Sequence, residues 1–360
     1  MLMLINKRFT ISYVFYDGGN METKIALIGT GGTIAGQGAS DTDLTGYTAG
    51  VLGLDEILDS VPGTEPYGPY TYTQFSNIES SDITVRHWLD LSKLVQELVN
   101  QEDIGGVVIT HGTDSMEETA YFLNLTVHTD KPIVITGSMR PAGAISADGP
   151  INLLQAIQVA RTPASVGKGV LVVLNGYVDG ARDVSKQNTT NVATFDSPLV
   201  GHLGIVQDGV AHYYKESTRR HTKESIFDVH DFKELPRVVI LTCYGGMDDM
   251  VPMSVVATNP DGLILTGLGH GTIPQNVRQI TQNTAFPTVR ASRTGSGMVS
   301  AVPQDALAGY LVSDTLSPQK ARILLMLGLT KTKNLKKLQQ FFYESVSYTH
   351  LRAHETCADL

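Results

Sequence analysis

KIALIGTGGTIAG, residues 24–36, joins an apolar run to a glycine-rich turn, and this junction indicates the fold class. Similar runs alternate with segments of helical periodicity along the chain, which favours a parallel α/β architecture. We predict strands at residues 24–28, 106–110, 132–136, 169–174, 237–241, 262–266 and 287–291. We predict helices at residues 88–98, 117–127, 151–160, 318–329 and 335–342.

The chain has 360 residues, which is too long for one core of ordinary size and favours two domains. A polar, charged segment at residues 215–236 has the composition of a domain linker. We therefore expect a larger domain at 21–214 and a smaller one at 237–345. Residues 1–20 are interpreted as an N-terminal extension and residues 346–360 as a non-native tail.

Composition excludes several classes of function. A net charge of −9 argues against a nucleic-acid partner, because such binding depends on clustered Lys and Arg. No apolar run reaches the roughly 18 residues of a membrane span, so no membrane partner is expected. Cys243 and Cys357 are too few for a disulfide framework or a metal knuckle, and we expect neither metal nor cofactor. No signal peptide is apparent, which favours a cytoplasmic location.

The glycine-rich turn matches neither of two familiar ligand loops. A dinucleotide fingerprint requires glycine at Ile34, and a phosphate-binding loop requires lysine at Gln37. Thr33 remains as a hydroxyl that the turn presents to a small substrate. The alternative interpretation is a tight turn in which Thr33 is only a helix cap, and the turn alone does not separate the two.

A second motif, ITHGTDSMEETA, carries another threonine from a strand into a helix. Asp114 with Glu117, or Ser115 with Glu118, has the spacing of a capping box, which explains Asp114 without chemistry. However, ligands bind at the carboxyl ends of strands in open α/β sheets, and both threonine turns follow such strands. The two turns are therefore expected to meet at one cleft.

Two more polar residues accompany these loops. Lys186 lies in DGARDVSKQNTTNVATF, and a single lysine in a polar loop is most often simply solvated. Because a threonine hydroxyl is a poor nucleophile, a site built on threonine needs a base, and a desolvated lysine relayed by an aspartate can supply one. His111 is expected to be a buried histidine with satisfied hydrogen bonds rather than a catalyst.

Taken together, several long phrases make the chain resemble the bacterial L-asparaginase family. They are TGGTIAG, HGTD followed by MEETA, KPIVITGSMRP, SADGPINL and DGARDVSKQNTT. The resemblance implies a two-domain asparaginase-like α/β fold, with a larger flavodoxin-like parallel-sheet domain and a smaller C-terminal α/β domain. It also implies a homotetramer with active sites at subunit interfaces, and hydrolysis of the small molecule asparagine to aspartate and ammonia. A glutaminase-asparaginase of broader specificity and a catalytically impaired amino-acid-binding homologue remain as alternatives.

The family's functional residues carry over by position. Thr33 matches the nucleophile and Tyr47 the tyrosine of the mobile loop, while Thr113, Asp114 and Lys186 match the catalytic relay. The implied substrate-binding set is Gly32, Ser80, Ser81, Thr113, Asp114 and Ser138. Within this set, the serine of NIESSDIT at position 80 binds the substrate α-carboxylate, and Asp114 also pairs with the α-ammonium.

The chain departs from the family pattern at three places. Ser81 stands where exported members carry Gln or Glu, as it does in the cytoplasmic branch, and Gly246 stands where an asparagine is expected. The acidic residue that a neighbouring subunit supplies has no clear match in TGSGMVSAVPQD. If Asp114 does not meet the substrate ammonium alone, the regions of Asp248 and Asp305 are the next candidates.

Overall fold

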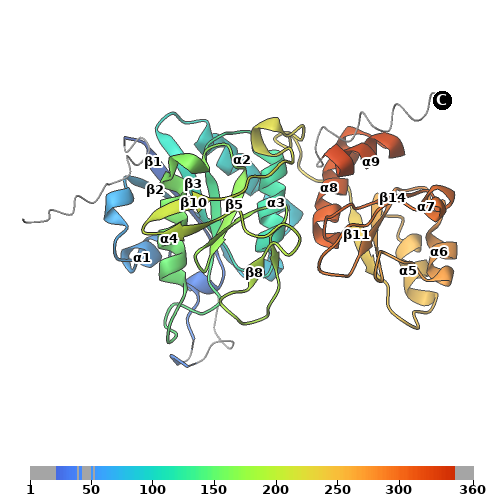
Figure 1. Cartoon of the computed structure of the whole chain (residues 1–360), viewed down its shortest axis with the longest axis horizontal. Coiled ribbons are helices and arrows are strands. Elements are labelled where there is room, and N and C mark those ends of the chain that lie inside the picture. Colours follow the sequence, from blue (N-terminus) through green and yellow to red (C-terminus); the bar gives the residue numbers. More distant parts are fainter. Residues whose placement is uncertain (1–21, 39, 43–49, 52, 345–360) are drawn as a thin grey trace, which may run out of the picture.

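The computed structural model describes residues 22–344 except 39, 43–49 and 52, and it contains two α/β units side by side (Figure 1). The larger unit is built on an eight-stranded sheet and the smaller on a four-stranded sheet. The fold class expected from the sequence is therefore confirmed. The expectations for residues 1–20, for the tail at 346–360 and for Tyr47 lie outside the described residues.

The large sheet has the order β10-β9-β6-β5-β4-β3-β1-β2. Its strands are β1 (Lys24–Gly31), β2 (Tyr70–Ile78), β3 (Ile104–Thr110), β4 (Ile133–Thr136), β5 (Val170–Leu174), β6 (Tyr177–Gly180), β9 (Gly204–Gln207) and β10 (Val210–Tyr213). The first five are parallel and follow the flavodoxin-like order 2-1-3-4-5. The remaining strands, β6, β9 and β10, extend this core in antiparallel fashion.

Helices cover both faces of the large sheet. They are α1 (Leu54–Asp59), α2 (Val85–Val99), α3 (Met116–Thr126) and α4 (Gly149–Arg161). Because side chains alternate along a strand, Ile25 and Leu27 of β1 pack in the core beneath α1 and α4, whereas Ala26 and Ile28 pack beneath α2 and α3. Short 3-10 turns complete this unit: η1 (Thr33–Ala35), η2 (Glu65–Tyr67), η3 (Ser80–Asp82) and η4 (Pro163–Ser165).

The smaller unit is a parallel sheet in the order β11-β12-β13-β14. Its strands are β11 (Val238–Thr242), β12 (Gly262–Gly267), β13 (Thr288–Ser292) and β14 (Tyr310–Val312). Its helices are α5 (Met250–Ala257), α6 (Gln275–Thr281), α7 (Pro303–Ala308), α8 (Pro318–Lys331) and α9 (Leu335–Glu344). Within the described part of the chain, no helix is both long and apolar enough to cross a membrane.

The two units share a continuous apolar core where α3 lies against α8 (Figure 1). Trp88 and Phe122 of the large unit belong to the same buried cluster as Ile323 and Leu324 of α8. The segment at 215–236, expected to be a linker, contains only the 3-10 turn η5 (Thr222–Glu224) and packs into this core through Phe227 and Val229. The small unit is therefore firmly docked on α3.

Candidate active site

The turns that follow β1 and β3 are packed against each other. The strands pair in parallel with Gly29 opposite Thr110, and the Thr30 hydroxyl donates to the Thr110 carbonyl oxygen at 2.9 Å. Gly32 has φ 82°, and a Cβ placed on it would lie 2.4 Å from the Gly112 Cα. Only glycine fits this contact. The two threonine turns predicted to converge are therefore adjacent in the structure.

Three of the predicted catalytic residues form a direct hydrogen-bonded group. The Lys186 Nζ donates to the Thr113 Oγ1 at 2.9 Å and to the Asp114 Oδ1 at 2.7 Å. Lys186 lies in the short β7–β8 hairpin (Ser185–Lys186 with Phe195–Asp196). Its side chain is 18% exposed, whereas the Asp114 side chain is 69% exposed. The lysine is thus partly desolvated, whereas the carboxylate is largely exposed.

Thr33 and Ser80 flank this group. Thr33 is buried at the first position of η1. The Ser80 hydroxyl accepts a hydrogen bond from the Asp114 main-chain N–H at 3.1 Å, and the Ser80 carbonyl accepts one from the Ser115 hydroxyl at 2.6 Å. These bonds hold η3 against the Thr113 turn. Ser81, in contrast, is exposed.

Ser138 has a different environment from the other predicted binding residues. It is fully buried, and its hydroxyl donates to the Arg140 carbonyl at 2.8 Å. The Asp148 carboxylate accepts the main-chain N–H groups of Met139 and Arg140 in the same turn. The Ser138 hydroxyl therefore contributes to the internal structure of the turn.

The capping box, which was the alternative interpretation of this motif, does not form. The helix follows Ser115 without a side-chain cap, and the Asp114 N–H bonds to Ser80 instead of to Glu117. The Glu117 Oε2 accepts the main-chain N–H of Lys186 at 2.7 Å. Glu117, in the first turn of α3, thus holds the segment that carries Lys186. The fold brings the Lys186 N–H, 69 residues away in the sequence, within hydrogen-bond distance of its carboxylate.

His111 is the buried histidine that the sequence predicted. Its Nδ1 lies 2.7 Å from the Gly112 carbonyl and donates to it, so its Nε2 accepts from the Thr119 hydroxyl at 3.0 Å. The Trp88 Nε1 donates to the same hydroxyl at 2.9 Å. Burial lowers the pKa of His111 to about 4, so the ring is neutral near pH 7. This chain of hydrogen bonds fixes the turn that leads to Thr113.

Asp248 and Asp305, the small-unit candidates for pairing with a substrate ammonium, differ in whether their carboxylates are already paired. The Asp305 carboxylate is buried and forms a two-pronged ion pair with Arg290, with N–O distances of 2.7 Å to each oxygen. Asp248 is exposed, and its Oδ1 accepts the Met250 N–H at 2.9 Å. Gly246 is also exposed. The Arg290 pair removes Asp305 as a free partner for a substrate ammonium.

Sequence reasoning did not assign a role to Glu117 or to Lys320. Glu117 was interpreted only as a capping residue, and no local pattern links it to Lys186, which is 69 residues away. Lys320 is a buried lysine of α8 whose ammonium reaches the large unit. It lies in the first turn of α8, after Ser317 and Pro318, and no local sequence pattern there predicts its burial. No cluster of three His, Cys, Asp or Glu side chains able to hold a metal occurs among the residues that the structure covers.

Threonine hydroxyls beside a lysine and a carboxylate, at strand ends of an α/β fold, are the side chains that one class of enzyme uses to activate a hydroxyl nucleophile. Comparison with known families narrows this class. The family model described as "Asparaginase, N-terminal" matches residues 24–219, and that of the "Glutaminase/Asparaginase C-terminal domain" matches residues 237–342. The chain therefore belongs to the asparaginase family.

Individual relatives are similar in sequence to this chain over most of their length. L-asparaginase 2 of Bacillus subtilis is 42% identical over 323 residues, covering 89% of this chain and 86% of the relative. Glutaminase-asparaginase of Pseudomonas fluorescens biotype A is 39% identical, covering 90% and 91%. The crystal structure of a probable cytoplasmic L-asparaginase from Campylobacter jejuni is 41% identical, with a TM-score of 0.87, and covers 89% of this chain and 99% of that one.

Proposed function

We propose that this chain hydrolyses L-asparagine to L-aspartate and ammonia with Thr33 as the nucleophile. The observation that carries the proposal is the contact of one lysine, Lys186, with both the Thr113 hydroxyl and the Asp114 carboxylate, in a turn packed on the Thr33 turn. The names of the relatives, which include L-asparaginases, support the choice of substrate.

The reaction is an acyl transfer in two halves. The Thr33 oxygen attacks the side-chain amide carbon, the C–N bond breaks, and the threonine proton passes to the nitrogen, which leaves as ammonia. Water then attacks the aspartyl ester, releasing aspartate and returning a proton to the Thr33 oxygen. The Thr113, Asp114 and Lys186 group carries these protons, a contribution of about 10²–10⁴ in rate.

Negative charge develops on the carbonyl oxygen during the attack, and it must be stabilised by hydrogen-bond donors that are not already engaged. The Gly32 N–H donates to the Ile78 carbonyl at 3.1 Å, so it is occupied. We assign the oxyanion contact to the Thr113 N–H, which lies just before the N-terminus of α3. A donor at this place is worth about 10²–10³ in other hydrolases, and the positive end of the helix dipole adds to it.

Substrate recognition follows from the charges of an amino acid. Ser80 is assigned to the α-carboxylate and Asp114 to the α-ammonium, and Ser80 is already joined to the Asp114 N–H at 3.1 Å. A zwitterion pays a large desolvation cost unless both of its charges find partners. Arg290 engages both carboxylate oxygens of the buried Asp305, whereas Lys186 contacts Oδ1 of the exposed Asp114, so we assign the ammonium to Asp114.

A broader amide specificity is the second candidate function. It is favoured by the relative named glutaminase-asparaginase and by the exposed serine at position 81. The kcat/KM values for asparagine and glutamine decide between the two candidates. We expect asparagine to be preferred by about tenfold or more, because one methylene group changes binding by about 1–3 kcal/mol.

We further propose a homotetramer with active sites at subunit interfaces. Helix α5 supports an interface, because its Met250 and Met253 side chains are 70% and 56% exposed and Pro252 is its only buried residue. A helix that is apolar on all sides is stable only when it is covered. Light scattering after size-exclusion chromatography tests this: the parent is expected to elute as four chains, and Met253→Glu as a smaller species.

We also propose a cytoplasmic location, on the identity of Ser81 and the resemblance to the cytoplasmic branch. The names of relatives include both a probable cytoplasmic and a probable periplasmic enzyme, so fractionation is the appropriate test. Activity in the osmotic-shock fraction of the native host would contradict this proposal.

Ammonia release from asparagine by the purified chain is the primary test of function. The parent is expected to release ammonia, whereas Thr33→Ala is expected to lose at least about 10³ in kcat while keeping its melting temperature, because the change removes one hydroxyl and little packing. Turnover by Thr33→Ala within about tenfold of the parent would remove Thr33 as the nucleophile. A folded parent without ammonia release would favour the amino-acid-binding homologue.

A further inference from the structure

Lys320 is a buried lysine of the small unit. It is 2% exposed and lies in the first turn of α8, where its main-chain N–H donates to the Ser317 hydroxyl at 3.4 Å. The helix start therefore fixes its position. Burying an ammonium group costs free energy unless it is given acceptors, so the atoms that Lys320 contacts are informative.

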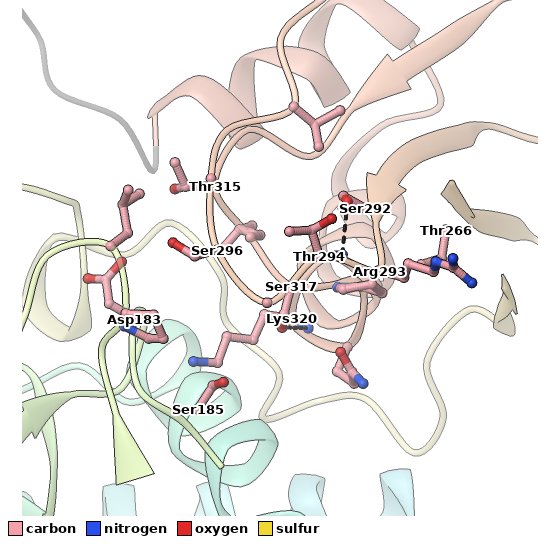
Figure 2. Close-up of a pocket in the computed structure, with 18 of the residues that line it drawn as sticks. Asp183, Ser185, Thr266, Ser292, Arg293, Thr294, Ser296, Thr315, Ser317 and Lys320 are labelled. Carbon is pink, nitrogen blue, oxygen red and sulfur yellow. Dashed lines mark hydrogen bonds between the residues drawn. The ribbon is translucent and has the colours of Figure 1, made fainter. Parts of the chain in front are cut away.

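The acceptors of Lys320 belong to the large unit. Its Nζ donates to the Arg182 carbonyl at 3.0 Å and also to the Val184 carbonyl. Both carbonyls precede Lys186 by four residues or fewer. Figure 2 shows the Lys320 side chain extended towards the segment that carries Asp183 and Ser185. The small unit thus holds the main chain immediately before the proposed catalytic lysine.

Two more contacts fasten the same segment. The Arg182 Nη2 donates to the Thr315 hydroxyl of the small unit at 2.8 Å. The Lys186 main-chain N–H donates to Glu117 of α3 at 2.7 Å, on the large-unit side. The small unit therefore holds the Arg182 end of residues 182–186, and α3 of the large unit holds the Lys186 end. From this end the Lys186 side chain reaches Thr113.

A cavity beside the segment leaves it room to move. It has a volume of about 400 Å³ and lies between the units, and Ser185, Lys186, Arg293 and Lys320 are among its lining residues (Figure 2). The Val184 side chain packs in the core of the large unit, but on the cavity side close packing is missing and the segment is held by hydrogen bonds. Loss of the Lys320 ammonium would allow the segment to shift.

From these contacts we infer that Lys320 is a positioning residue for the proposed reaction: by holding the Arg182 and Val184 carbonyls, it keeps Lys186 in contact with Thr113 and Asp114. This inference rests on the proposed function of Lys186. It makes the geometry of the relay in the large unit depend on docking of the small unit.

The cost of the arrangement supports a specific role. Burial lowers the pKa of Lys320 to about 8, and Glu117, Asp183 and Asp179 offset this effect while Arg182 adds to it. An apolar side chain of similar length would dock two units without that cost, as replacements of buried ion pairs have shown. What an apolar residue lacks is the ability to hold two carbonyl oxygens in place.

Lys320→Met is the direct test, because methionine keeps the length and loses the donors. We expect kcat to fall by about tenfold or more and KM to change by less than about threefold, since the relay is displaced while Ser80 and the Asp114 main chain stay in place. Thermal unfolding of the same variant reports on folding.

Arg322→Met is the matched control. Arg322 lies on the same helix, its Nε donates to the Val238 carbonyl at 3.0 Å, and its guanidinium lies 5.9 Å from the centre of the Trp88 ring of the large unit. It touches the large unit without touching residues 182–186. A role in general docking predicts equal losses of kcat for the two variants, whereas positioning predicts that Arg322→Met stays within about twofold of the parent.

A double-mutant cycle shows whether Lys320 acts through Lys186. We expect Lys320→Met to cause no further loss of kcat in a Lys186→Met background, because residues that act as one unit are not additive. If Lys320→Met does not fold, Thr315→Val releases the Arg182 side of the same segment, and a kcat loss of about threefold or more is expected.

The outcomes separate this inference from the proposed function. Three results each overturn the positioning role. The first is an unchanged kcat in a folded Lys320→Met. The others are an equal fractional loss of kcat when Lys320→Met is added to the parent and to Lys186→Met, and an equal loss of kcat in Arg322→Met. Unchanged kcat in Lys186→Met overturns the proposed relay itself. A large loss in Lys186→Met without one in Lys320→Met rejects the positioning role alone.

Discussion

The strand ends of the large and small sheets have the same topological position but different structures. After β1 and β3, Gly32 packs on Gly112, and Thr33 and Thr113 are buried. After β13, residues 293–298 are all exposed, and the Ser292 hydroxyl donates to the Gly269 carbonyl at 2.5 Å and accepts from the Thr294 main-chain N–H at 3.0 Å. The difference shows that a strand end becomes a candidate site when a neighbouring turn packs on it and a third segment brings a charged group.

The glycine contact between the two threonine turns provides the largest test of this comparison. Gly32→Ala places a Cβ 2.4 Å from the Gly112 Cα at φ +82°, so the turns must separate. We expect kcat/KM to fall by about 10² or more. Gly167→Ala is the matched control, because Gly167 has φ +75° and nothing within 4 Å of the added Cβ. Equal losses in both variants would attribute the effect to backbone strain alone.

Asp114→Asn tests whether the carboxylate at the large-sheet site has two roles. The exchange keeps size but removes the charge, so we expect KM for asparagine to rise by about tenfold and kcat to fall. A pure relay role would affect kcat alone. Steady-state kinetics distinguish the two possibilities. If KM stays within about twofold, another acid meets the substrate ammonium, and Asp248→Asn becomes the next variant, because Asp305 is already paired.

The smallest expected effect comes from His111, the buried histidine next to the Thr113 turn. Its titration changes stability rather than turnover. The pKa of His111 is lowered to about 4 by burial, from an ordinary value of 6.5. Between these values the unfolded chain binds a proton that the folded chain does not, so stability falls as pH decreases from 6.5 to 4. The loss amounts to at most about 3 kcal/mol.

Urea unfolding at several pH values measures this loss. We expect the free energy of unfolding of His111→Gln to depend less on pH in this window, although the variant is less stable overall because the bonds to Gly112 and Thr119 are weakened. An identical pH dependence in parent and variant would assign the acid sensitivity to other groups.

Local sequence predicted most of the parallel strands and the helices α2, α3, α4, α8 and α9, because their apolar periodicity reflects burial. It missed the short parallel strand β14 and the short helices α1, α5, α6 and α7. It missed β2, whose residues YTYTQFSNI alternate between half-buried and exposed and pair only with β1 at the sheet edge. It also missed β6, β9 and β10, which are four residues each and too short for a periodic signal.

The candidate site was predictable where its residues follow glycine-rich turns at strand ends, as Thr33 and Thr113 do. Lys186 was identified through resemblance, since a lone lysine in a polar loop has no pattern of its own. The partners of Glu117 and Lys320 were not predictable, because their hydrogen bonds join residues 69 and more than 130 positions apart. The Lys320 contacts depend on how the two units dock, and the Glu117 contact depends on tertiary packing within the large unit. No local propensity encodes either.

The most direct test asks which threonine carries the acyl group. The enzyme is mixed with asparagine, quenched in acid within the first turnovers, digested and analysed by mass spectrometry. The account predicts an aspartyl ester on the peptide that contains Thr33, and its accumulation in Lys186→Met if removal of the ester by water is slowed more than its formation. An aspartyl ester on the peptide that contains Thr113 would contradict the account, because Thr113 would then be the nucleophile and Thr33 a residue of the turn.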